Sequence, residues 1–211
     1  MSERISLKET ERQAFRATFR DGLWDVLLGC IMLQFAIAPL LSTRLGDFWS
    51  SAVWLPFFLL VYLVILLLRK YVVKPRLGTV KFGPARTRRL MHFSLVMLVV
   101  NILALALGIV AALNPTLVGS MAPIALGVMI LAGLSLMAYF LDYPILYVYG
   151  VLLALAPPVG EWLWRNKLVA HHGFPVTFGI LAALMILIGL VKFVALLRRY
   201  PLPATDEPEG A

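Results

Sequence analysis

The sequence predicts an all-α polytopic membrane helix bundle, and three observations carry this prediction. The chain has 211 residues, of which 61% are hydrophobic and only 14% are charged, whereas a soluble domain is about half apolar and about a quarter charged. The apolar residues gather in several runs of about 20 residues, the length that crosses a hydrocarbon core. The charged residues lie in short segments between these runs, so lipid is expected to cover the apolar surface.

The predicted transmembrane bundle covers residues 22–197 and contains six spans. We expect them at 22–41, 49–68, 90–113, 120–140, 144–157 and 176–197. The region 120–157 decides between five and six spans, because it is too long for one crossing and adequate for two closely packed ones. Before the fifth and shortest span, Asp142 can cap a new helix and Pro144 suits a first helical turn.

The distribution of basic residues predicts the orientation of these spans. The formal net charge is +8, and with six spans most cations fall on one side, in the N-terminal segment, the loop 69–89 and Arg198-Arg199. The positive-inside rule assigns that side to the cytoplasm. We therefore expect a multi-pass inner (plasma) membrane protein with both termini in the cytoplasm. Cations at a membrane surface favour anionic lipid headgroups, not nucleic acid, as the partner.

The two ends of the chain are predicted to lie outside the bundle. Residues 1–21 are expected to form a cytoplasmic amphipathic helix, because Arg12, Arg16 and Arg20 recur every four residues and phenylalanines form a second stripe. Such a helix lies on the membrane with its rings in the acyl boundary; the alternative is a solvated extension of the first span. Residues 198–211 are proline-rich and acidic, which predicts a disordered tail.

The segment 69–89 is the most polar internal stretch and contains no acidic residue. Two stretches of strand-like composition flank Pro75-Arg76-Leu77-Gly78, which suits a turn, so a small hairpin is expected. Its cations are candidates for binding lipid headgroups or an acidic membrane or cytoplasmic protein, and positive-inside bias alone is the alternative. The candidate residues are Lys74, Arg76, Lys81, Arg86, Arg88 and Arg89, together with Arg12, Arg16 and Arg20.

Asp21 and Asp25 open the first span as two acids four residues apart. A helix places both carboxylates on one side, and Gly22 leaves room for a close neighbour. Asp25 lies about one turn inside the membrane boundary, where an unpaired carboxylate is costly. We expect both acids to form ion pairs with cations of the loop 69–89, and a role in handling protons or cations is the alternative.

Two short motifs resemble a group of uncharacterised bacterial multi-span inner-membrane proteins. These motifs are Asp21-Gly22-Leu23-Trp24-Asp25 at the first span and Pro75-Arg76-Leu77-Gly78-Thr79-Val80 after the second. The resemblance covers about the first third of the chain. It implies membrane class and topology and no activity.

The sequence contains no pattern typical of an enzyme site. Cys30 is the single cysteine, so an internal disulfide is excluded. Glycine-rich nucleotide loops and Cys-x-x-Cys pairs are absent, and His171, His172 and Glu161 match no standard zinc spacing. We therefore predict no catalytic residue, no metal site and no cofactor.

Two functions from different classes agree with these features. The first is a non-enzymatic accessory or assembly component that holds lipid or a partner protein at its basic cytoplasmic face. The alternative is a small passive or secondary transporter with Asp25 near its pathway. A transporter normally carries polar groups at the membrane midplane, where this chain offers mainly Gln34, Asn101 and Ser135.

Overall fold

The computed structural model describes residues 19, 21–77, 84–113 and 121–201, and within these ranges the chain is helical and has no strand. The helical elements are α2 (Leu23–Ala52), α3 (Trp54–Leu68), the π-helical turn η1 (Arg69–Val73), α4 (Lys74–Leu77), α5 (Pro84–Leu113), α7 (Ala122–Leu141), α8 (Ile145–Arg165), the 3-10 turn η3 (His171–Gly173) and α9 (Phe174–Arg199).

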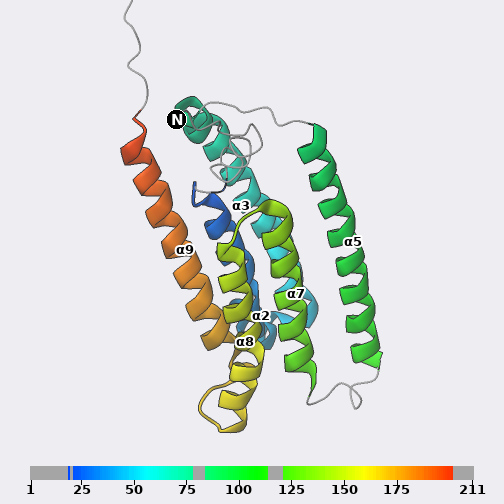
Figure 1. Cartoon of the computed structure of the whole chain (residues 1–211). Coiled ribbons are helices and arrows are strands. Elements are labelled where there is room, and N and C mark those ends of the chain that lie inside the picture. Colours follow the sequence, from blue (N-terminus) through cyan, green and yellow to red (C-terminus); the bar gives the residue numbers. More distant parts are fainter. Residues whose placement is uncertain (1–18, 20, 78–83, 114–120, 202–211) are drawn as a thin grey trace, which may run out of the picture.

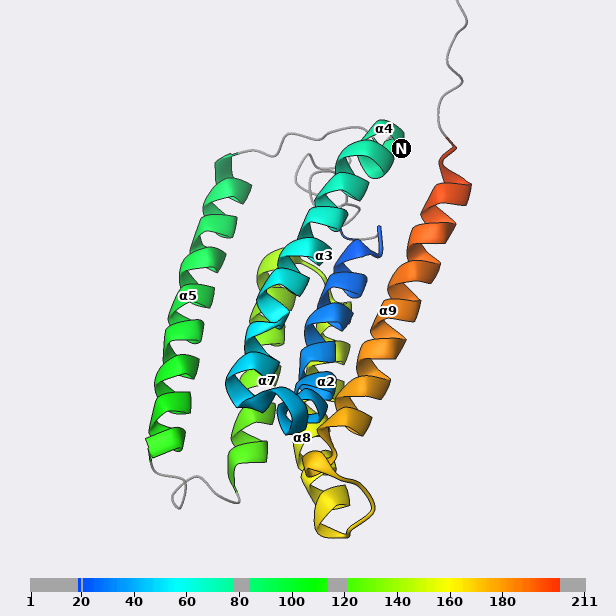
Figure 2. The same ribbon diagram turned by 180° about the vertical axis from the view of Figure 1, so that it is seen from behind.

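Six of the described segments are long and apolar enough to cross a membrane, which confirms the predicted polytopic bundle. They are Leu23–Gly46, Phe48–Arg76, Thr87–Ala106, Ala122–Leu141, Ile145–Arg165 and His171–Arg199. Successive spans run in alternate directions, and α2 begins at the end of the bundle where α9 finishes (Figures 1 and 2). That end also holds α4 and the α7–α8 turn, and we call it the basic end.

Helix α2 packs along α9, α7 packs along α8, and α8 also contacts α9, while α5 lies at the edge of the bundle against α7 (Figure 1). Glycines allow the closest approaches between backbones. A Cβ atom added to Gly29 of α2 would lie 2.6 Å from Ile186 Cγ1 and 3.0 Å from the Ala182 oxygen on α9. Small residues have this role in membrane bundles, because lipid tails are as apolar as the helices and packing must drive association.

The first two spans meet at a sharp break in the chain. Gly46 has φ 77° and ψ 164°, values outside the helical region, and only glycine adopts such a backbone at little cost. Pro39 lies earlier in the same helix, where it removes the helical hydrogen bond to the Phe35 carbonyl. The break therefore replaces the loop expected between residues 41 and 49.

The predicted hairpin within 69–89 is wrong for the part that the structure describes. The second span continues through η1 into α4 as far as Leu77, so Tyr71 to Lys74 are helical. The valines favour a strand, but the helical conformation prevails, because a helix that extends from a membrane span satisfies its backbone hydrogen bonds within one segment. The third helix likewise begins earlier than predicted, at Pro84.

The fifth span is also longer than predicted. Asp142 does not cap it; this residue ends α7 in a left-handed conformation with φ 55°. Helix α8 continues past Pro157 and Pro158. Pro158 has no N–H to donate to the Ala154 carbonyl, and this carbonyl lies against Gly127 of α7 instead. A Cβ on Gly127 would lie 2.3 Å from that oxygen, so the two helices approach this closely only because residue 127 is a glycine. The predicted tail 198–211 begins too early, since Arg198 and Arg199 still belong to α9. The rest of that tail beyond residue 201 and nearly all of the surface helix predicted over residues 1–21 lie outside the described residues.

Candidate functional site

The acids of the first span lie inside the bundle, close to its basic end. Asp21 is 2% exposed and Asp25 is fully buried. The Lys192 ammonium group on α9 lies 2.7 Å from Asp25 Oδ2, and the Tyr143 hydroxyl lies 3.1 Å from both carboxylate oxygens. Lys192 also donates to the Tyr143 hydroxyl at 3.2 Å. One carboxylate thus joins α2, the α7–α8 turn and α9.

Tyr143 is positioned for this role by the turn that carries it. Asp142 adopts the left-handed conformation that ends α7, and the Tyr143 ring stacks on Phe19 with centroids 5.6 Å apart. Burial, followed by the charge of Asp25, raises the pKa of the Tyr143 hydroxyl above its ordinary value of 10. The hydroxyl therefore stays protonated and donates to Asp25.

Asp21 connects the first span to the second. Its Oδ1 accepts the Leu23 backbone N–H at 3.0 Å, and its Oδ2 accepts the Arg69 Nε–H at 3.2 Å. The guanidinium of Arg69 also lies over the Trp24 ring, 5.2 Å from its centroid. Burial raises the pKa of Asp21 above 3.8, although Arg69 acts in the opposite direction.

Gly22 brings the start of α2 against α9. It has a left-handed φ of 76°, and a Cβ added to it would lie 2.2 Å from the Gly189 carbonyl oxygen. Gly189 itself has no room for a side chain, since its added Cβ would lie 2.6 Å from the Gly22 oxygen. This contact holds Lys192, one turn further along α9, beside Asp25.

The prediction that cations of 69–89 pair with these acids is confirmed for Asp21, which binds Arg69. It is wrong for Asp25, whose partner is Lys192 on the last span. From the sequence alone, a lysine this near the end of the last predicted span, 176–197, is expected to extend to the membrane surface, and the structure instead pairs it with Asp25. A single lysine within an apolar span is itself a signal of an internal partner.

The candidate binding cations differ in how freely they are available. Lys74 and Arg88 are exposed at the basic end, as are Lys70, Arg198 and Arg199. Arg89 is engaged with α7: it donates to the Tyr139 carbonyl, lies over the Tyr139 ring and is 4.0 Å from Asp142. The structure does not describe Arg12, Arg16, Arg20 and Lys81, nor the side chain of Arg86.

Arg76 has an unusual environment for a cation. It is half-buried, and its Nε and Nη1 atoms are shielded from solvent without a hydrogen-bond partner in the described part of the chain. A buried guanidinium without acceptors is costly, because its donors have lost water and gained nothing in return. The arrangement therefore favours an anion at this position.

The opposite end of the bundle carries a second polar group. Glu161 accepts hydrogen bonds from Arg165 at 2.9 Å and pairs with His172 Nδ1 at 2.8 Å. The imidazole ring also packs on Trp164, with centroids 4.1 Å apart. Among the described residues no three potential ligands of the His, Cys, Asp and Glu types lie together in a way that could hold a metal ion.

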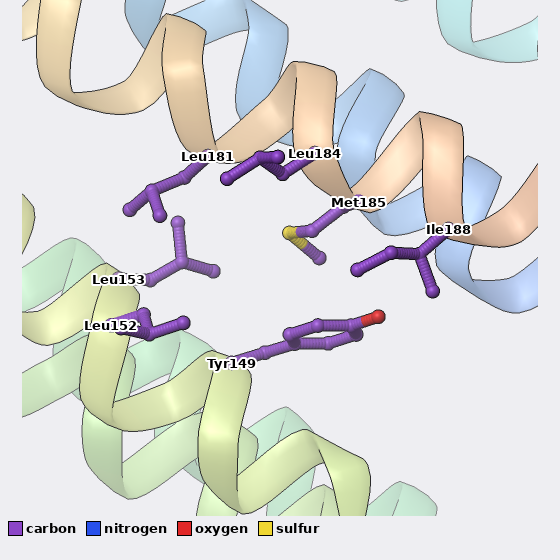
Figure 3. A pocket seen from close by; sticks show the side chains of 7 residues that line it. All are labelled: Tyr149, Leu152, Leu153, Leu181, Leu184, Met185 and Ile188. Atoms are coloured by element: carbon purple, nitrogen blue, oxygen red, sulfur yellow. The ribbon is translucent and has the colours of Figure 1, made fainter.

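Between α8 and α9 the bundle contains a small cavity of about 90 Å³. Apolar side chains from both helices face one another across it, and the Tyr149 hydroxyl lies at one edge (Figure 3). The lining residues are Tyr149, Leu152, Leu153, Leu181, Leu184, Met185 and Ile188. This cavity offers no polar route past Asp25 toward the middle of the membrane.

Comparison of the chain with family models, curated proteins and solved structures finds no match.

Proposed function

We propose that this integral membrane protein is a non-enzymatic accessory or assembly component whose basic end lies in the cytoplasm and holds anionic phospholipid headgroups. One observation carries the proposal: among the residues that the structure describes, the charge exposed at that end is positive. The described acids there are Asp21, Asp25 and Asp142, and each is buried or nearly so and lies within 4.0 Å of a cation. They cannot neutralise the exposed lysines and arginines.

Arg76 is the residue on which a headgroup phosphate fits best. Its Nε and Nη1 atoms lack a partner in the described part of the chain, and Lys74 is exposed two residues earlier. Cations near an anionic surface each contribute about 1 kcal/mol. The positive-inside rule supports the same orientation, since the described cations of the opposite end are only Arg44, Arg165 and Lys167.

Lipid retention by purified protein tests this proposal. Wild type should keep phosphatidylglycerol in preference to phosphatidylcholine when detergent-solubilised complexes are weighed by native mass spectrometry. The double variant Lys74→Gln/Arg76→Gln should lose about 2 kcal/mol of that preference, roughly 30-fold in affinity. The matched control Arg44→Gln/Lys167→Gln removes two exposed cations from the opposite end and should change nothing.

Two results would count against lipid as the ligand. Equal retention of both lipids by wild type would remove the basis of the proposal. Capture of an acidic protein from native membranes by wild type, lost in Lys74→Gln/Arg76→Gln, would replace the headgroup by a protein partner at the same face.

A transporter with Asp25 near its pathway is the second candidate, and the buried group around Asp25 favours it. Ionisable side chains inside a membrane often mark proton or ion pathways, and Asp25 contacts both a lysine and a tyrosine hydroxyl. Liposomes containing wild type or Asp25→Asn distinguish the two candidates. Proton or cation flux that disappears in Asp25→Asn would overturn the accessory role, and no flux in either protein would exclude this transport.

A further inference from the structure

A second and larger pocket lies at the break in α2, at the end of the bundle opposite the basic end. Its volume is about 250 Å³. The second half of α2, the short helical stretch after Gly46 and the start of α9 form its walls. The lining residues are Gln34, Phe35, Ala38, Pro39, Ser42, Ser50, Ser51 and Phe174.

The backbone around this pocket is irregular within a membrane span. Pro39 deprives the Phe35 carbonyl of its helical donor, and Gly46 leaves the helical region altogether. Ser42 compensates in part, because its hydroxyl donates to the Pro39 carbonyl at 3.0 Å. Gly46 is the last residue of the first span, so this irregular backbone lies where the first two spans meet, at the surface of the membrane.

Gln34 brings hydrogen-bonding capacity to the middle of the membrane. It lies at the centre of the 24-residue span Leu23–Gly46, and its amide makes no hydrogen bond to the described part of the protein. An amide offers two donors and two acceptor sites. Gln34 is only half-buried, so its amide is available to a partner that enters the pocket.

We propose that this pocket binds a small uncharged polyol that enters from the side opposite the basic end. The lining contains an amide and three serines and no charged side chain, so it matches a neutral ligand with several hydroxyl groups. Phe35 and Phe174 supply flat apolar walls for the carbon skeleton. The pocket lies away from the proposed lipid site, and neither proposal depends on the other.

Cysteine labelling tests whether water reaches Gln34. In a Cys30→Ser background, which removes the only native cysteine, Gln34→Cys and Ser42→Cys should react with a membrane-impermeant thiol reagent added from the side of Arg44. Leu40→Cys is the control, because Leu40 is 47% exposed on the same helix and does not line the pocket. A folded Gln34→Cys variant that fails to react while Ser42→Cys reacts would overturn the proposal.

Protection of Ser42→Cys tests the ligand class, with glycerol and glucose as probes and choline and acetate as charged comparisons. A bound probe at about ten times its Kd should slow labelling about tenfold, and adding Gln34→Leu should abolish this protection. Size-exclusion chromatography checks that each variant remains folded. No protection by either polyol at about 100 mM, equal protection by the charged probes, or protection that survives Gln34→Leu would each overturn the assignment.

Discussion

Removing Lys192 should destabilise the protein far more than removing the charge of its partner, Asp25. The reason is the difference in exposure, since Asp25 is fully buried whereas Lys192 is 31% exposed. In Lys192→Met the carboxylate stays buried and keeps only the Tyr143 hydroxyl as a donor. In Asp25→Asn the lysine can extend toward the headgroups, because its stem is long and its end lies near the surface.

The structure sets the expected magnitudes. Breaking a buried pair by removing one partner typically costs about 3–5 kcal/mol. In Lys192→Met the Asp25 carboxylate still accepts from the Tyr143 hydroxyl, which places the expected loss in the lower part of this range. We therefore expect about 3–4 kcal/mol for Lys192→Met. Asp25→Asn should cost about 1 kcal/mol, because the amide oxygen still accepts from Tyr143.

A double-mutant cycle measures this asymmetry. Unfolding free energies come from titration with sodium dodecyl sulfate in mixed micelles, followed by tryptophan fluorescence, with Lys167→Met as a control for loss of an exposed lysine. Asp25→Asn/Lys192→Met should be little worse than Asp25→Asn alone, a coupling of about 3 kcal/mol. Equal costs for the two single variants, or additive costs in the double variant, would refute the reasoning.

Two further predictions concern the neighbours of this pair. Gly22→Ala should destabilise by at least about 2 kcal/mol, because its Cβ would lie 2.2 Å from the Gly189 oxygen and φ is 76°; Gly133→Ala, with open space around it, is the control in the same assay. Burial raises the pKa of Asp21 above 3.8, so the folded protein binds that proton more tightly than the unfolded chain. The free energy of unfolding should therefore increase as the pH falls from above this raised pKa to about 3.8. The variant Asp21→Asn should lack this increase. A pH profile of Asp21→Asn identical to that of wild type would contradict the second prediction.

The six spans could be predicted because length and apolarity are local properties of the chain. The predictions that failed concerned prolines, which usually end helices. The fifth span is predicted to end at residue 157, yet α8 continues through Pro157 and Pro158, and the Ala154 carbonyl lies against Gly127. Whether a proline ends a helix inside a membrane depends on what lies against the freed carbonyl, and that depends on tertiary structure.

Only one of the two ion pairs in the candidate site could be predicted from the sequence. Asp21 and the cations after the second span had to reach the same end of the bundle, so a pair such as that with Arg69 followed from topology. The choice of Lys192 for Asp25 depends on α2 lying beside α9, which requires the contact between Gly22 and Gly189. No local pattern encodes a contact between the first span and the last.

The separation of Asp25 and Lys192 by 167 residues has a consequence for biogenesis. A nascent chain that has inserted its first span carries a carboxylate whose cation has not yet been synthesised, and contacts this distant along the chain form late. The first helix reaches its final surroundings only after the last one has entered the bilayer. Products that stop before Lys192 would expose an unneutralised acid within the membrane, a defect that cellular quality control can recognise.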